Sequence, residues 1–238
     1  SKTHRLQATS EHRWVHSTET GHAQCAPLTS SRATVYLAPE GSFDFWSRHI
    51  DASTDDERFA ALIGMLVSDG RATDDSAGLR AEIYQTERKF YAEFMRVIPP
   101  EAVMYNRIRT LADHHEIRIK ARWLGPRMIE AGLTISRGSG LKDSPSLMRW
   151  ITGLSLREVQ AFFSAVWLSD GSTAYPVHKK ISCGSETLRR VIQVAAYRLG
   201  CSTHETNDGY GMWSTKPRMG IKMAGARCST RTMARSES

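Results

Sequence analysis

The chain has 238 residues, of which 40% are hydrophobic and 24% charged, and its formal net charge is +7 at pH 7. It is long enough for one large or two small domains, and the absence of a signal peptide or a membrane-spanning run argues against a membrane protein. The basic charge favours a polyanionic partner. The cysteines lack the close spacing of a zinc site or a disulfide framework, so we expect a reducing, cytoplasmic compartment: Cys25, Cys183, Cys201 and Cys228.

Residues 1–52 are polar and rich in histidine, and we expect them to form a small segment of short β-strands. Within them Thr9-Ser10-Glu11-His12 resembles the Thr-x-x-His block of inteins, the self-splicing elements that often carry endonuclease domains. The resemblance implies that Thr9 and His12 hold and activate a scissile peptide bond. The alternative is a strand and turn with a solvent-facing histidine. Because the other splicing blocks are not found, we expect that this segment does not splice by itself.

The next element is a helix predicted from residue 54. Thr54 and Glu57 form a Ser/Thr-x-x-Glu capping box, which satisfies the free amides of the first helical turn. The run at 60–67 is apolar nearly all round, which predicts a buried helix that is far too short to span a bilayer.

Four residues near the end of this helix carry further information. Gly64 and Ser68 stand four apart and would form a flat strip that lets a second helix approach closely. Gly70 suits the left-handed conformation just past a helix end. Asp69 faces the negative end of the helix dipole, where a carboxylate costs free energy. We infer that this charge is required there.

The rest of the first half alternates between strands and helices. We predict a polar turn at 71–78, a strand at 79–86, a helix from 86 to 98 ended by two prolines, strands at 103–110 and 116–123 joined by a hairpin around His114 and His115, and a short helix at 126–132.

Basic residues alternate along the predicted strands, so they share one face of the sheet. Such a face suits the phosphates of a duplex, although a solvated edge is the alternative. The residues that we expect on it are Arg107 and Arg109 on one strand, and Arg118, Lys120 and Arg122 on the next. On another strand Arg80, Glu82 and Tyr84 share a face, and they are candidates for contact with base edges.

A flexible joint is predicted at 136–140, and after it the helix pattern returns. Ser155 and Glu158 form a second capping box, and an apolar run at 161–168 leads to Asp170 and a glycine. Every landmark is displaced from the first copy by 101 positions, as 155 − 54 and 170 − 69 both show. A match of this kind without gaps indicates a repeated structural unit.

The two segments LIGMLVSDG at 62–70 and FSAVWLSDG at 163–171 resemble the paired motifs of single-chain LAGLIDADG homing endonucleases. The alternative is two ordinary core helices that end in Asp-Gly turns. The resemblance implies an α+β fold, in which two pseudo-two-fold related αββαββα halves form two antiparallel sheets and a DNA-binding saddle. We expect halves at 53–140 and 141–224 after the intein-like segment at 1–52, and a disordered tail at 225–238.

The same resemblance implies a catalytic centre where the two helices end. Asp69 and Asp170 would bind divalent ions, most simply Mg²⁺, with help from the backbone at Ser68 and Ser169. Lys142, which follows the joint, would be the basic residue of the centre. Its counterpart in the second half would be Lys222, with Lys216 as an alternative.

The second half is predicted to repeat the first more briefly. We expect strands at 173–177 and 180–183, a helix at 185–199, and strands near 202–206 and 211–223. The expected DNA contacts on these strands are Lys180, Lys216 and Arg218.

Four functions are consistent with these residues. The first is a site-specific, monomeric, double-strand DNA endonuclease derived from an intein. The second is a DNA-binding protein of the same fold without catalysis. The third is a fragment of a protein-splicing intein, and the fourth is an RNA-splicing maturase. We predict double-stranded DNA as the partner and Mg²⁺ as the cofactor.

Overall fold

The computed structural model describes two compact units, Ser1–Pro39 and Glu40–Ser238. The described residues are 13–17, 23–27, 47–86, 88–109, 114–175, 178–208 and 218–224. In the first unit β1 (Arg13–Ser17) pairs with β2 (Ala23–Pro27) in an antiparallel ladder. Thr9, His12 and Lys216 lie outside the described residues, as does the predicted tail, so the intein-like segment stays a prediction.

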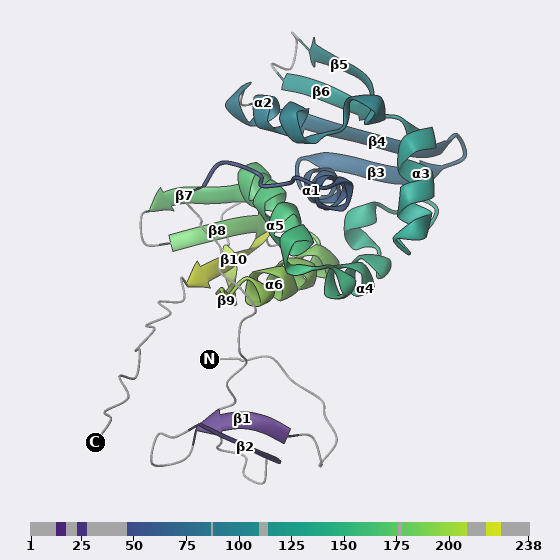
Figure 1. Cartoon of the computed structure of the whole chain (residues 1–238). Helices are drawn as coiled ribbons and strands as arrows, with labels where there is room; N and C mark the ends of the chain where they lie inside the picture. The colour runs from purple at the N-terminus through teal and green to yellow at the C-terminus, as the bar shows by residue number, and fades with distance from the viewer. Residues whose placement is uncertain are drawn as a thin grey trace. The chain divides into compact units, whose positions relative to one another are not determined.

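The second unit has helices and antiparallel strands in alternation, which confirms the predicted α+β class (Figure 1). Its elements are α1 (Asp55–Val67), β3 (Gly70–Asp75), β4 (Gly78–Gln85), α2 (Arg88–Val97), β5 (Val103–Arg109), β6 (His114–Ile119), α3 (Ala121–Glu130), α4 (Ser146–Gly153), α5 (Leu156–Asp170), β7 (Gly171–Tyr175), β8 (His178–Cys183), α6 (Glu186–Arg198), β9 (Ser202–Asp208) and β10 (Arg218–Ala224), with short 3₁₀ turns η1 (Pro100–Ala102) and η2 (Leu141–Asp143).

Two four-stranded sheets follow the helices α1 and α5. One has the order β3-β4-β6-β5 and the other has the order β7-β8-β10-β9, so in each the fourth strand lies between the second and the third. In the first sheet α2 and α3 both contact β4, and in the second sheet α6 contacts β8 and β9. The helices α1 and α5 thus lead directly into the edge strands of their sheets, β3 and β7.

The helices α1 and α5 pack against each other in the core, as the small residues predict (Figure 1). A Cβ atom on Gly64 would lie 2.5 Å from the carbonyl oxygen of Phe162 and 2.9 Å from Cβ of Ala165. The backbones can approach this closely only because Gly64 has no side chain. Both predicted capping boxes are present, at Thr54 and at Ser155. The apolar runs of both helices are buried, as expected.

The glycines after the two helices have a different role from the predicted one. Gly70 and Gly171 start strands, and Gly171 has φ −76° rather than a left-handed value. A Cβ atom on Gly70 would lie 2.7 Å from the carbonyl oxygen of Glu82, and one on Gly171 would lie 2.2 Å from that of Trp167. These positions require glycine because neighbouring backbone is too close for a side chain.

Several predicted boundaries were wrong. Residues 71–75 form a strand rather than a turn, because their backbone pairs with β4 in an antiparallel ladder. His114 and His115 belong to β6 rather than to a hairpin turn. The strand ends at Ile119, since α3 begins at Ala121, and α4 was not predicted. The predicted joint at 136–140 contains a turn and ends in a β-bridge between Thr73 and Gly140.

Candidate functional site

Asp69 and Asp170 lie where the two packed helices end. Asp170 is the last residue of α5, and Asp69 lies between α1 and β3. Burial and the charge of Asp69 raise the pKa of Asp170 from 3.8 to about 7, while the charge of Lys142 acts in the opposite direction. The three groups are therefore close enough to interact electrostatically, as the arrangement of the two helices predicts.

Gln85 is a site residue that the sequence did not reveal. Its side-chain amide Nε2 donates to Oδ2 of Asp69 at 2.7 Å, and the residue is only 5% exposed. The backbone N–H of Tyr84 donates to the carbonyl oxygen of Asp69 at 3.1 Å, which fixes the backbone at this position. The end of β4 thus orients the Asp69 carboxylate. Only the register between β3 and β4, which brings Gly70 opposite Ile83, could have indicated this contact.

The hydroxyl groups of Ser68 and Ser169 are directed back into their own helices. Ser68 Oγ donates to the carbonyl oxygen of Gly64 at 2.7 Å, and Ser169 Oγ donates to that of Ala165 at 3.0 Å. A metal ligand from these residues would therefore be a backbone carbonyl rather than a hydroxyl, which agrees with the backbone role given to them above.

Lys142 is held by its backbone in η2. The hydroxyl of Ser185 donates to the carbonyl oxygen of Lys142 at 2.9 Å, while the side chain of Lys142 is exposed. The preceding turn is attached to the first sheet by the Thr73–Gly140 bridge and by the N–H of Gly138, which donates to the carbonyl oxygen of Asp74 at 3.4 Å. The segment between α3 and α4 thus brings a lysine within electrostatic reach of Asp170.

Lys222 and Lys180 are described in their backbone positions. The register places Lys222 opposite Lys180 and also opposite His204, and it places Lys180 opposite Ser172, next to the start of β7. Lys222 therefore lies on the central strand β10, in the same cross-strand row as Ser172, one residue beyond the row of Gly171. Its catalytic role stays a prediction.

The polar face of the first sheet carries four of the predicted DNA contacts. Arg80, Tyr84 and Arg118 all donate to the carboxylate of Glu82, and Arg107 donates to that of Glu116. Side-chain burial is nearly complete for both carboxylates, at 2% and 1% exposure. The basic face is thus a set of arginines fixed by buried acids rather than a row of independent cations.

The remaining predicted contacts lie at different places. Lys120 precedes α3, and its Nζ donates to the carbonyl oxygen of Glu101 at 2.9 Å, while Arg122 lies in α3. The prediction that these two residues continue the strand face of Arg118 was therefore wrong, because the strand ends before them. Arg109 is opposite His114 in the β5–β6 register, and Arg218 is opposite Asp208 in the β9–β10 register.

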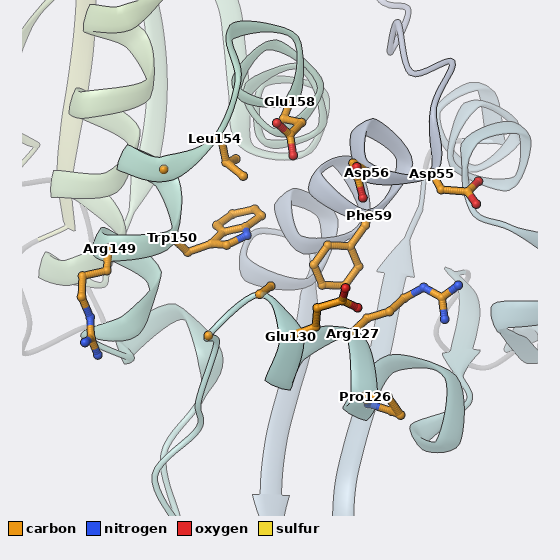
Figure 2. A pocket seen from close by; sticks show the side chains of 13 residues that line it. Asp55, Asp56, Phe59, Pro126, Arg127, Glu130, Arg149, Trp150, Leu154 and Glu158 are labelled. Carbon is orange, nitrogen blue, oxygen red and sulfur yellow. The ribbon is translucent and has the colours of Figure 1, made fainter.

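A pocket of about 860 Å³ lies at the opposite ends of the helices (Figure 2). Asp55 and Asp56 of α1 and Glu158 of α5 line it together with Trp150 and Arg127. Acidic residues in a first turn stabilise the helix dipole, which accounts for these three carboxylates. The pocket is separated from Asp69 by the length of α1, about 20 Å for a helix of this size. Its lining contains none of the residues predicted for catalysis.

The donor set suits a hard divalent cation. Within the described residues no three His, Cys, Asp or Glu side chains gather as a metal site, and the carboxylates that the sequence predicts as metal ligands are Asp69 and Asp170. Mg²⁺ accepts such a site, because it is commonly bound by one or two carboxylates together with water and substrate phosphates. Burial, together with the charge of Asp69, raises the pKa of Asp170, and a cation between the two carboxylates would favour its ionised form.

Comparison with known proteins gives structural neighbours. No protein-family model and no curated protein matches the chain. The chain is similar to mesophilic variants of the homing endonuclease I-DmoI, with 15% identity, a TM-score of 0.48 and coverage of 71% of this chain and 89% of that one. For I-DmoI in complex with DNA and Ca the values are 15%, 0.49, 71% and 83%.

The chain is also similar to full-length DUF199/WhiA from Thermatoga maritima, with 10% identity, a TM-score of 0.48 and coverage of 74% of this chain and 54% of that one. For the N-terminal LAGLIDADG domain of DUF199/WhiA the values are 10%, 0.46, 74% and 80%. In the part of the chain that the structure describes, no helix has the length and apolar character needed to cross a membrane.

Proposed function

We propose that this protein is a site-specific, metal-dependent double-strand DNA endonuclease of the LAGLIDADG type. The observation that supports the proposal is the electrostatic interaction of Asp69, Asp170 and Lys142 at the ends of two closely packed helices. Each carboxylate comes from a different half of the unit, so each would serve one strand of a duplex. The chain is basic overall, which suits a DNA partner.

The residues have distinct tasks in this proposal. Asp69 and Asp170 would hold Mg²⁺, which supplies activation of water and stabilisation of the leaving oxygen in phosphodiester hydrolysis. Gln85 holds the Asp69 carboxylate in place through its 2.7 Å hydrogen bond. Lys142 offers a positive charge to the negative charge that develops on the phosphate. Lys222 is proposed for the same task in the second half.

The proposal is tested by the variants Asp69→Asn and Asp170→Asn. We expect the full chain to cut a duplex that carries its target in the presence of Mg²⁺, and each variant to lose at least about 100-fold in cleavage rate, because removal of a charge-stabilising group typically costs that much. DNA affinity, measured by a mobility shift, should stay within a few-fold of that of the unchanged protein. Asp143→Asn, at an exposed acid beside Lys142, serves as the control and should cut normally.

Two outcomes would overturn the nuclease assignment. Cutting by either variant at the full rate would remove the carboxylates from the mechanism. Sequence-specific binding by the unchanged chain without cutting would instead support the alternative, a DNA-binding protein of this fold that lacks catalysis.

Descent from an intein and a monomeric active form belong to the same proposal. Sedimentation of the DNA complex tests the second of these.

A further inference from the structure

The polar face of the first sheet contains two clusters of the same design. In the first, Arg80 donates from Nε and Nη2 to Oε1 of Glu82 at 3.0 and 2.8 Å. The hydroxyl of Tyr84 donates to the other oxygen, Oε2, at 2.7 Å. Arg118 also donates to Oε1 from Nη1. The Glu82 carboxylate, which is 2% exposed, is thus saturated by donors from its own strand and the neighbouring one.

The second cluster repeats this design on the adjacent strands. Arg107 donates from Nε and Nη2 to Oε2 of Glu116, both at 3.1 Å. The hydroxyl of Tyr105 donates to Oε1 at 3.0 Å, and Glu116 is 1% exposed. Arg107 Nη2 also donates to Oε1 at 3.4 Å, so each cluster consists of a buried carboxylate that accepts from an arginine and, at one oxygen, from a tyrosine.

The arginines present the same part of the guanidinium group in both clusters. Arg80 and Arg107 use their Nε–Nη2 edge for the carboxylate, so the opposite Nη1–Nη2 edge points away from it. The two side chains are 49% and 51% exposed. That outer edge is the fork of donors that fits O6 and N7 of guanine in the major groove.

A phosphate-binding role does not account for these clusters. Buried carboxylates on a DNA-binding face reduce its positive potential and weaken its attraction for phosphates. In return they fix a long side chain that would otherwise lose rotamer entropy on binding. The arrangement thus favours directional recognition over general affinity.

Building on the nuclease proposed above, we propose that Glu82 and Glu116 are positioning residues for sequence recognition. They hold Arg80 and Arg107 with their outer edges towards the duplex, so that the first sheet recognises guanine at two nearby positions. Glu116 is a diagonal neighbour of Glu82, since Glu82 is opposite Arg118. Diagonal neighbours are ~7–8 Å apart, which corresponds to about two base-pair steps.

The second sheet has no glutamate at the positions equivalent to Glu82 and Glu116. We therefore expect the positioning of arginines to act on only one side of the DNA target. Gly70 and Gly171 hold the same place at the start of their sheets, opposite Ile83 and Ile181. By that register Lys180 takes the position of Glu82, and Gly220, opposite Ser182, takes that of Glu116. We therefore expect fixed guanine preferences only in the half of the target that the first sheet contacts.

The experiment is the selection of bound duplexes from a randomised pool by the full chain carrying Asp69→Asn, so that binding is measured without cutting. We expect two guanine preferences within about two base-pair steps. Glu82→Gln and Glu116→Gln should each lower one of them about tenfold, the discrimination expected of one bidentate contact. Affinity for duplex of random sequence should stay equal or rise, because a negative charge has left the face.

Two further sets of variants separate positioning from folding. Arg80→Lys and Arg107→Lys keep the charge and remove the planar fork, so they should lose the same preferences even if the glutamate variants do not fold. Glu93→Gln is the matched control, because Glu93 forms a partly buried pair with Arg96 at 2.7 Å on α2, away from the sheet face. It should lower stability and leave base preferences unchanged.

The results that would contradict this inference differ from those that would contradict the nuclease proposal. If the chain selects a sequence but the glutamate and arginine variants keep its guanine preferences, this inference is overturned and the proposed nuclease stands. A parallel fall of specific and random-sequence affinity in Glu82→Gln would mean that the cluster only maintains the fold. If the full chain binds no duplex, the nuclease proposal falls and the inference falls with it.

Discussion

At the scale of single residues, Asp170 is the most unusual group in the described chain. Burial and the charge of Asp69 raise its pKa to about 7, although Lys142 acts against them. Its position at the carboxyl end of α5 adds the unfavourable helix dipole. An ionised Asp170 therefore lowers the stability of the folded protein. The metal-binding role proposed above for Asp170 would offset this cost, because a bound cation stabilises the ionised carboxylate.

The effect of Asp170 on stability depends on pH. Because its folded pKa lies above the ordinary value of 3.8, the folded state holds the proton more tightly, and the free energy of unfolding falls as pH rises from about 4 to about 7. We expect Asp170→Asn to remove this loss and to stabilise the protein at pH 8 by up to about 4 kcal/mol, with little effect at pH 4. Urea unfolding at both pH values, in a chelating buffer, measures it.

The control for this experiment is Asp143→Asn, at an exposed carboxylate on the other side of Lys142. It should change the free energy of unfolding by less than about 0.5 kcal/mol at either pH. An Asp170→Asn protein no more stable than the unchanged one at pH 8 would show that the carboxylate is not under electrostatic stress. Millimolar Mg²⁺ should reduce the difference, since it binds only the protein with both carboxylates.

At this scale the sequence singled out the residues that are marked by the repeat, and their catalytic role stays a prediction. Asp69 and Asp170 were identified because the displacement of 101 positions singles them out. Gln85 has no such mark, and its contact with Asp69 depends on a strand register that spans 16 positions. Glu82 and Glu116 were not recognised as buried acids for the same reason, because their arginine and tyrosine partners come together only after the strands have paired.

At the scale of elements, the α1–α5 contact determines where the two carboxylates lie. Gly64 is the point of closest approach, with the carbonyl oxygen of Phe162 only 2.5 Å from the position of a Cβ atom. That neighbour is backbone and cannot rotate away. A side chain at this position must therefore move one helix relative to the other.

Gly64→Ala should destabilise the protein by about 1–3 kcal/mol through overpacking, and it should also lower cleavage by shifting the carboxylates. Thermal unfolding and a cleavage assay measure the two effects. Gly153→Ala is the matched control, since Gly153 is helical and has no atom within 4 Å of its Cβ position. There the same substitution should be neutral or slightly stabilising. Equal behaviour of the two variants would rule out a close contact at Gly64.

The amino-terminal ends of the same helices are joined by opposite charges. Nε of Arg157 on α5 donates to Oε1 of Glu57 on α1 at 2.9 Å, and the N–H of Ser53 donates to Oε2 at 2.6 Å. Burial raises the pKa of Glu57, but the Arg157 guanidinium and the donors of Ser53 and Thr54 outweigh it and bring the pKa to about 2. The amino-terminal ends of α1 and α5 are thus held together by an ion pair, whereas Asp69 and Asp170 repel each other at the carboxyl-terminal ends.

This ion pair predicts a loss of stability in acid. Because the folded pKa of Glu57 lies below its ordinary value of 4.5, the stabilisation is complete above pH 4.5 and disappears as pH falls towards 2. Glu57→Gln keeps the capping box but should show a smaller decrease in free energy of unfolding between pH 5 and 2. The control is Glu158→Gln, which changes the equivalent capping residue of α5. Identical acid profiles for the two variants would contradict the role of Arg157.

Elements with chemical signals at their ends were predicted well. The capping boxes gave the starts of α1 and α5, and the two prolines gave the end of α2. The start of α3 was missed because Lys120 provides no side-chain cap and Pro126 lies inside the helix. The strand β3 was missed because its residues are polar and only Ala72 is buried, so no apolar alternation distinguished it from a turn.

At the scale of the whole molecule, the α+β class followed from the resemblance of the two repeated segments to paired LAGLIDADG motifs, whereas the order of strands did not. Placing the fourth strand between the second and the third requires backbone pairing between distant segments, for which hydrophobic patterns carry no information. For charge as well, the sequence predicted only the net value of the whole chain. The sequence gives +7, but which arginines are neutralised by buried carboxylates depends on the folded sheet.

The connection between the halves has a consequence for how this protein can be rearranged. Its residues are anchored to β3 through Gly140 and to α6 through the Ser185 hydroxyl, and Thr134 is hydrogen-bonded to Ser146 at 2.9 Å. A recombinant that exchanged one half for a foreign one through a generic glycine-serine spacer would lose Lys142 together with its support. Modular shuffling of this protein must therefore place its crossovers outside residues 134–146.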